Sequence, residues 1–307
     1  MIVAITGANG FIGYHLARGF ADAGWDVRAI VRRDFASGDA ERLVADADVV
    51  VHAAGETRAP SVAALQAANV ALTQRVVNAA VRGGVGRFVL VSSQAAMGPA
   101  PALDRPVTES ATPAPVEAYG RAKLDAEHVV RRAHDLPFTI VRPAAVYGPR
   151  DRDFLAMFRL ARLGLALHPA NREQWISIVH VRDVARAVIV AATHPNALGG
   201  EFFVANEEPV QWRELFRAAA ECAGRSLRAD VEAPAWLVRA GAALGDVAAR
   251  ISGRAGLLTS GKAALAAPRF WVCSAERARR ELAITPAVPL RRGIAETYHW
   301  YLEQGWL

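Results

Sequence analysis

Residues 1–13 of the chain read MIVAITGANGFIG. Residues 2–5 are apolar and partly β-branched, which predicts a short, buried, parallel strand. Gly7, Gly10 and Gly13 follow at intervals of three, and a helical pattern begins after them. Glycines at such a turn let backbone N–H groups approach a pyrophosphate, which the positive end of the helix dipole also attracts. Because a second strand follows the helix, the stretch predicts a dinucleotide-binding βαβ unit rather than an empty glycine-rich turn.

The end of the second strand bears on the choice of cofactor. Residues 26–31 (DVRAIV) are the predicted strand, and Arg32 and Arg33 follow it. In a dinucleotide fold an acidic residue at this point holds the ribose 2′-hydroxyl, whereas arginine suits a 2′-phosphate. We therefore expect NADP, with NAD as the alternative; a solvated arginine pair without a ligand is the plainer interpretation. Residues 35–48 are short for a strand-and-helix unit, so we expect the next strand to be vestigial.

Strands and helices alternate over the first two thirds of the chain. Further strands are predicted at residues 48–51, 87–91, 138–141 and 201–204, and helices at 60–82, 117–134 and 180–192. The alternation predicts an α/β fold, a doubly wound parallel sheet of the Rossmann type with a smaller, mostly helical C-terminal substrate lobe. We expect residues 1–149 to form the dinucleotide-binding domain, with 175–205 returning to its sheet. Residues 150–174 and 206–307 then form the lobe.

Composition excludes several classes of protein. The 307 residues carry a formal charge of +6, but the arginines are scattered, so no nucleic-acid partner is expected. Cys222 and Cys273 are far apart and outside any CxxC, which indicates neither a disulfide framework nor a metal site. No signal segment or apolar run of about 18 residues is present, so we expect a cytoplasmic protein without stable membrane insertion. Residues 234–254 are mildly amphipathic and basic, a pattern that we interpret as a lid helix rather than a membrane contact.

Ser93, Tyr119 and Lys123 are the candidate catalytic residues. Tyr119 and Lys123 are four residues apart in a predicted helix, so they share one face. An ammonium about 4 Å from a phenolate stabilises it by roughly 4 kcal/mol at an effective dielectric of 20, enough to lower a tyrosine pKa towards neutrality. Tyr119 can then exchange a proton with a substrate oxygen that Ser93, at a strand end, holds in position. His52 is also at a strand end, but a lone histidine there is more often structural.

Taken together, these motifs resemble those of the extended short-chain dehydrogenase/reductase family, of the NAD-dependent epimerase/dehydratase type. The matching segments are TGANGFIG at 6–13, VVVHAAG at 49–55, VSS at 91–93, YGRAK at 119–123, RPAAVYGP at 142–149 and VHVRDVARA at 179–187. The overall look is similar to the branch of 3β-hydroxysteroid dehydrogenases and dihydroflavonol reductases. The resemblance covers nearly the whole chain.

The resemblance implies a set of site residues and an oligomeric state. It assigns Asn69 to a helix-bending, proton-relay position in the catalytic set. It also implies a homodimer formed through the helices around Asn69 and Tyr119. The residues that it assigns to cofactor binding are Gly7, Asn9, Gly10, Phe11, Ile12, Gly13, Arg32, Arg33, Ala53, Ala54, Gly55, Tyr119, Lys123, Pro143 and Val146.

Three functions are compatible with these residues. The leading hypothesis is an NAD(P)-dependent oxidoreductase that interconverts a ketone and a secondary alcohol by hydride transfer. The alternative is a nucleotide-sugar epimerase with tightly held NAD, in which Arg150, Arg152 and Arg172 grip a diphosphate. A hypothesis of another class is a non-catalytic protein that senses the dinucleotide, but the intact catalytic set argues against it.

Two further details narrow the substrate. Gln94, Ala95 and Ala96 stand where family dehydratases place acidic residues, which argues against a sugar-nucleotide dehydratase. Four aromatic residues of the lobe either line a moderately apolar substrate site or belong to the core. These four are Trp212, Trp236, Phe270 and Trp271.

Overall fold

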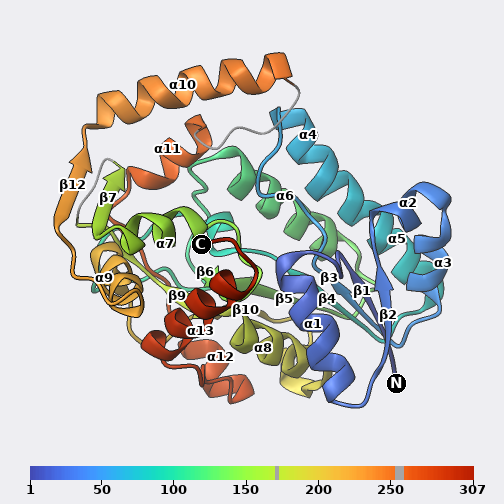
Figure 1. Ribbon diagram of the computed structural model, residues 1–307. Coiled ribbons are helices and arrows are strands. Elements are labelled where there is room, and N and C mark those ends of the chain that lie inside the picture. The colour runs from blue at the N-terminus through green and yellow to red at the C-terminus, as the bar shows by residue number, and fades with distance from the viewer. Residues whose placement is uncertain (170–172, 253–258) are drawn as a thin grey trace.

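A six-stranded parallel sheet forms the centre of the molecule (Figure 1). The structure is a computed structural model that describes residues 1–169, 173–252 and 259–307. The strands are β1 (Ile2–Thr6), β2 (Asp26–Ile30), β3 (Val49–His52), β4 (Arg87–Val91), β5 (Phe138–Pro143) and β10 (Glu201–Val204). They lie in the order β10-β5-β4-β3-β1-β2, so the winding reverses at β1, where a doubly wound sheet binds its ligand. The predicted Rossmann-type fold is confirmed.

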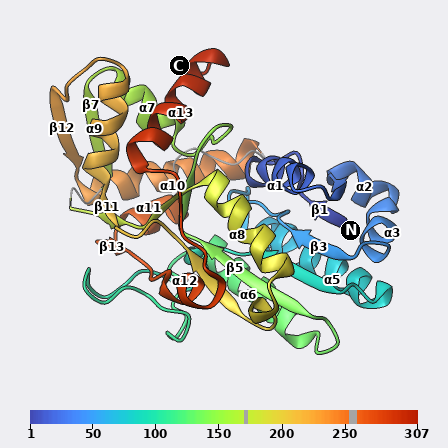
Figure 2. The same ribbon diagram turned by 90° about the horizontal axis from the view of Figure 1, so that it is seen from below.

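Helices cover both faces of the sheet because the strands bury side chains on both sides. Val3 and Ile5 of β1 enter one core with α1 (Phe11–Asp22) and α8 (Val181–Thr193), whereas Ala4 between them enters a second core. That second core is covered by α3 (Asp39–Ala45), α5 (Leu72–Gly83) and α6 (Ala118–Arg132). Figure 2 shows α1 and α8 on one side of the sheet and α5 on the other. Strands buried on both faces explain the continuous apolar runs in the sequence.

The sheet ends at β2, as the short segment 35–48 predicted. Residues 31–48 form two short helices, α2 (Arg32–Ser37) and α3, and then lead directly into β3. Gly83, at the end of α5, lies against the backbone of Ala45 at the end of α3. A Cβ added at Gly83 would come within 2.2 Å of the Ala45 carbonyl oxygen. Because Gly83 has no side chain, the end of α3 can pack closely against the end of α5.

The remaining elements belong to the connections and to the C-terminal lobe. The lobe has a third core, built from α7 (Leu155–Arg162), α9 (Trp212–Cys222) and α13 (Leu290–Glu303), with a two-stranded ladder of β7 (Leu165–Pro169) and β12 (Ala229–Ala233). The long helix α10 (Ala235–Ser252) and the short α11 (Ser260–Ala266) pack together across the top of Figure 1. The other elements are α4 (Val62–Gln66), β6 (Ala145–Tyr147), β8 (Trp175–Ile176), β9 (Ile178–His180), β11 (Val210–Gln211), β13 (Phe270–Trp271), α12 (Glu276–Leu282) and three short turns, Ala67–Ala71, Gln94–Ala96 and Pro195–Ala197. Among the residues that the structure describes, no helix has both the length and the apolar composition needed to cross a bilayer.

We expect Gly83→Ala to destabilise the protein by about 1–3 kcal/mol, because the new methyl group overpacks the contact with Ala45. Urea unfolding measures this change. The exposed neighbour Arg82 in the same helical turn provides the control, Arg82→Ala, which should leave the midpoint nearly unchanged. Equal midpoints for the two variants would contradict the tight packing of α3 on α5.

Candidate active site

The predicted cofactor-binding segments lie in a row along the carboxyl edge of the sheet. From β2 to β5 the strand ends carry Arg32, the loop 7–13, residues 53–55, Ser93 and then Pro143. The row spans the point where the strand order reverses, which is where a doubly wound sheet binds a dinucleotide. Val146 lies just beyond, on β6, where it pairs with β9.

The glycine loop is shaped by contacts that leave no room for side chains. Gly7 has a φ of +72°, and a Cβ there would lie 2.8 Å from Ala54 of the neighbouring loop. A Cβ at Gly13 would lie 2.0 Å from the Gly7 carbonyl oxygen. Gly10 caps α1 without any side-chain hydrogen bond, and Phe11 and Ile12 follow in the first turn with Asn9 just before. The N–H groups at this end of α1 thus fit the phosphates of a dinucleotide.

Three consecutive residues at the end of β4 contact three successive turns of α6. Ser93 hydrogen-bonds with the Tyr119 hydroxyl. The Lys123 ammonium donates to the Val91 carbonyl oxygen at 2.7 Å. The Ser92 hydroxyl donates to Glu127 Oε1 at 2.6 Å. Residues 119, 123 and 127 are four apart, so one face of the helix carries the whole set.

Gly120 and Glu117 hold the start of α6 in this position. The Glu117 carboxylate caps the helix by accepting from the N–H groups of Tyr119 and Gly120. A Cβ at Gly120 would lie 2.3 Å from the Ala95 carbonyl oxygen, so only glycine lets the helix approach the turn after Ser93 so closely. Because Gly120 lets α6 approach this turn, the residue before it, Tyr119, reaches Ser93.

Burial affects the two titratable groups in opposite directions. Burial raises the pKa of Tyr119 to about 12, and the hydrogen bond from Ser93 only partly opposes it. Burial also lowers the pKa of Lys123 to about 8, against the pull of Glu127. The phenol is thus protonated at neutral pH in the protein without cofactor. The lowering of the Tyr119 pKa by Lys123 remains a prediction for the loaded site.

A buried ion pair lies directly behind Lys123. Both oxygens of Glu127 accept from Arg142, at 2.9 and 2.7 Å, and Arg142 also binds Glu201. Glu127 and Arg142 are 0% and 1% exposed. Arg142 is the last residue but one of β5, so the pair ties α6 to the strand that ends in Pro143. Neither residue was predicted for the site. Glu127 could have been found from the sequence, because it stands four residues after Lys123 and therefore on the same face of the helix.

His52 and Asn69 belong to one chain of hydrogen bonds. The His52 ring lies between the hydroxyls of Thr6, at 2.6 Å, and Thr73, at 2.9 Å, and Thr73 in turn donates to the Asn69 carbonyl oxygen. Burial lowers the pKa of His52 to about 3, so the ring is neutral. Thr6 also accepts from the N–H of Ala54. His52 thus has the structural role expected of it. The hydrogen bonds on either side of its ring link the loop that contains Ala54 to Asn69.

Asn69 itself lies in a π-helical turn, Ala67–Ala71, between α4 and α5. Its side-chain amide donates to the carbonyl oxygens of Leu65 at 2.9 Å and Glu56 at 3.0 Å. A Cβ at Gly55 would lie 2.6 Å from its Oδ1 atom. The predicted helical stretch 60–82 is thus divided by a π turn at Asn69, the position where the resemblance implied a bend. The proton-relay role of Asn69 stays a prediction.

The arginine pair after β2 begins a short helix instead of extending the strand. Arg32 forms an ion pair with Glu56, and Arg33 lies 3.7 Å from Asp34, with both arginine side chains more than 85% exposed. Asp34 turns back and accepts from the Val31 N–H at 2.7 Å. The Asp34 carboxylate therefore serves as a helix cap, and the nearest strand-end acid already has a backbone partner.

The remaining predicted residues are the arginines and aromatic residues singled out for the substrate. Arg150 lies over the Tyr14 ring at 4.1 Å and Arg152 over the Trp306 ring at 5.0 Å, while Arg172 is outside the described residues. Of the lobe aromatics, Trp212 packs on Phe154 in the core. The other three are Phe270 and Trp271, partly buried against core clusters, and Trp236, exposed.

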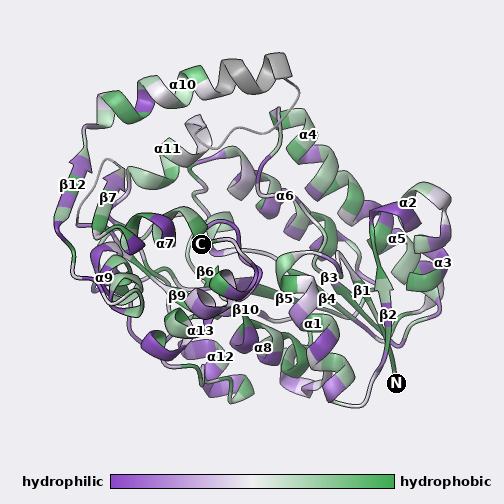
Figure 3. Ribbon diagram, viewed as in Figure 1, coloured by the Kyte–Doolittle hydropathy of each residue, from purple (hydrophilic) through white to green (hydrophobic). Residues whose placement is uncertain are grey.

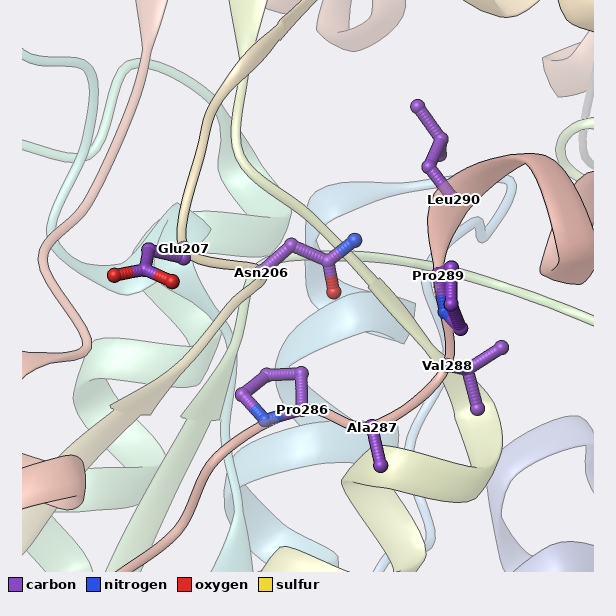
Figure 4. A pocket seen from close by; sticks show the side chains of 7 residues that line it. All are labelled: Asn206, Glu207, Pro286, Ala287, Val288, Pro289 and Leu290. Carbon is purple, nitrogen blue, oxygen red and sulfur yellow. The ribbon is translucent and has the colours of Figure 1, made fainter.

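A shallow groove of about 220 Å³ lies elsewhere, between the segment after β10 and the start of α13. Figure 4 shows its lining, with the Asn206 side chain turned towards Pro289 across the groove. Because no predicted site residue lines it, the groove is not the candidate active site.

Comparison with known proteins identifies the family. The model described as the NAD dependent epimerase/dehydratase family matches residues 3–205. The chain belongs to this family. A ceramide reductase from Caulobacter vibrioides is 30% identical over 325 residues, which cover 100% of this chain and 96% of the relative. A UDP-glucose 4-epimerase from Vibrio cholerae is 27% identical, and the match covers 71% of this chain and 74% of the epimerase.

Solved structures of the family share the fold. MoeE5 in complex with UDP-glucuronic acid and NAD superimposes with a TM-score of 0.80 at 24% identity, covering 99% of this chain and 100% of that one. Since the family's relatives are reductases and epimerases, the chain is an NAD-dependent enzyme of the extended short-chain dehydrogenase/reductase type, as the motifs predicted.

We expect Glu127→Gln to move the alkaline limb of the pH–turnover profile to lower pH. Glu127 raises the pKa of Lys123, so without its charge Lys123 loses its proton at lower pH and no longer favours the phenolate. The profile of kcat between pH 6 and 10 measures the shift. Glu201→Gln is the matched control, because Glu201 binds the same Arg142 but is not among the charges acting on Lys123. A wild-type profile for Glu127→Gln would refute the role.

Proposed function

We propose that the protein is an NADP-preferring reductase that converts a hydrophobic ketone to a secondary alcohol. The observation that carries this proposal is the row of contacts between the end of β4 and α6, which brings Ser93, Tyr119 and Lys123 together. The full-length match to a protein named ceramide reductase supports reduction and a lipid-like substrate.

The proposed mechanism assigns one task to each residue. A bound nicotinamide supplies the hydride. Ser93 holds the carbonyl oxygen beside the Tyr119 hydroxyl, which donates its proton to that oxygen as negative charge develops. Burial keeps the phenol protonated beforehand, with its pKa at about 12, which suits the reducing direction. Lys123 then stabilises the phenolate electrostatically, and its amine is fixed by the Val91 carbonyl oxygen.

The preference for NADP rests on the end of β2. Asp34, which would otherwise face a ribose 2′-hydroxyl, is engaged as a helix cap. Arg32 and Arg33 are exposed beside it and offer two guanidinium groups for a 2′-phosphate. Binding would require Arg32 to exchange Glu56 for the phosphate.

The second candidate is a nucleotide-sugar epimerase that holds NAD tightly. The epimerase relative and the fold of the MoeE5 complex with NAD support it. The cation–π contacts of Arg150 and Arg152 weaken it, since these side chains would have to leave their rings to grip a diphosphate.

We also propose a cytoplasmic homodimer formed through α5 and α6, and a division into the two lobes expected from the sequence. A surface groove between these helices is lined by Val77, Val81 and Val129, together with polar residues. Of these valines only Val81 is exposed, at 38%, so pairing of two copies would cover this apolar side chain.

We expect the double substitution Arg32→Ala, Arg33→Ala to weaken NADPH binding about tenfold or more, since charge-assisted hydrogen bonds to the phosphate are lost. NADH binding should change little. Fluorescence titration of both cofactors measures the two affinities. Arg28→Ala, in the preceding strand, serves as the control. Equal losses for NADPH and NADH would rule out the assignment to the 2′-phosphate.

We expect the purified enzyme to bind NADPH reversibly, more tightly than NADH, and to oxidise it when given long-chain ketones. Tyr119→Phe should lower turnover at least about a hundredfold while cofactor affinity stays near normal, because only the proton donor is removed. Stoichiometric NAD released on denaturation, without ketone reduction, would instead favour the epimerase. Full activity of Tyr119→Phe would exclude the proton-transfer role.

A further inference from the structure

The ladder of β7 and β12 presents apolar side chains to solvent. Leu167 pairs with Val231 across the two strands, and these side chains are 43% and 52% exposed. The alternating neighbour His168 points inward, is fully buried and contacts the ring of Phe216 in α9. Leu165, two residues before Leu167 and on the same outer face, is 37% exposed. The inner face of β7 thus buries His168 together with Ala166, whereas leucine and valine side chains of the ladder lie outside.

The first half of α10 continues this surface. Val238 and Ala242, four residues apart, are buried on the face towards the protein. Trp236, Leu237 and Leu244 are 66%, 51% and 72% exposed. In Figure 3 the described part of α10 carries mostly the colours of apolar residues. α10 follows β12 directly in the chain, and we call the exposed apolar side chains of the ladder and of the helix, together with Leu163, the apolar edge (Leu163, Leu165, Leu167, Val231, Trp236, Leu237 and Leu244).

Arginines accompany the apolar edge. Arg162, Arg228 and Arg239 are exposed, and none has a carboxylate partner among the described residues. Arg228 lies against Gly164, next to Leu163. Of the ladder's acids, Asp230 is paired with Arg213 and His168, and Glu232 is exposed. Among the described side chains named here, the exposed arginines thus outnumber the exposed acid.

We propose that the apolar edge docks on the surface of an anionic phospholipid membrane, a role for α10 that replaces the lid expected from the sequence pattern. Large apolar side chains that gather on an exposed surface mark an interaction site. A leucine-rich helix face with a tryptophan and arginines matches the boundary between anionic headgroups and acyl chains. A second copy of the chain is a poorer partner, because a two-fold contact would bring the same unpaired arginines together. Docking goes beyond the proposed reduction and does not require it.

The apolar edge lies near the start of the helix that carries Tyr119. α10 packs on α11, and a side chain added at Gly261 of α11 would come within 3.9 Å of Glu117, the cap of the helix that carries Tyr119. The membrane would thus contact the elements that lie beside the start of α6.

Flotation of the full-length protein with vesicles tests the proposal. With vesicles of three parts phosphatidylcholine to one part phosphatidylglycerol we expect most of the protein to float, and much less with phosphatidylcholine alone. Leu237→Ser with Leu244→Ser should lower partitioning at least tenfold. Leu198→Ser, a leucine 55% exposed in the turn before β10, is the matched control and should float like wild type. Arg162→Gln with Arg228→Gln and Arg239→Gln should reduce binding mainly to the anionic vesicles.

Several results would overturn the proposal. They are absence of flotation with anionic vesicles, equal flotation of the double leucine variant and wild type, and indifference to headgroup charge. A dimer in solution that the leucine substitutions convert to a monomer, without vesicle binding, would assign the surface to a second copy. Unchanged NADPH binding shows that each variant is folded, and reduction of a water-soluble ketone without vesicles tests the proposed function separately.

Discussion

The whole candidate site depends on how α6 is fixed to the end of β4. Burying Glu127 and Arg142 costs desolvation, which is offset only because both carboxylate oxygens meet the guanidinium and a serine hydroxyl. Loss of either partner would leave a buried charge, so the helix has one stable register against the sheet. This register sets where Tyr119 and Lys123 lie. The ion pair thus fixes the positions of Tyr119 and Lys123 without contacting either side chain.

The parallel order of the strands does the rest of the positioning. Segments far apart in the chain become neighbours because each follows a strand of the same sheet. Thr6 and His52, at the ends of β1 and β3, then link the glycine loop to the helix that contains Asn69. The link is neutral throughout, so it is insensitive to pH in the working range of most enzymes.

Much of this arrangement was predictable from local patterns. The glycine spacing, the apolar strands and the Tyr119–Lys123 interval each depend on a few adjacent residues, and the sequence states them directly. The vestigial strand was visible as a segment too short for one. The contacts of Glu127 with Arg142 and of His52 with Thr73 join residues 15 and 21 positions apart, and no local period reports them. A helical pattern does not reveal one extra residue in a turn, so only the family resemblance indicated a bend at Asn69, where the π turn lies.

The short edge strand β2 has a consequence for how copies of the chain can meet. No strand of the described residues pairs with the outer side of β2, so one row of its backbone N–H and C=O groups lacks a ladder partner there. The strand has only five residues, Asp26 is exposed, and Arg28 is turned to the Asp46 carbonyl oxygen. A charged, short edge is a poor template for a strand from another molecule. The β2 edge of the sheet therefore resists pairing with a strand from another copy of the chain.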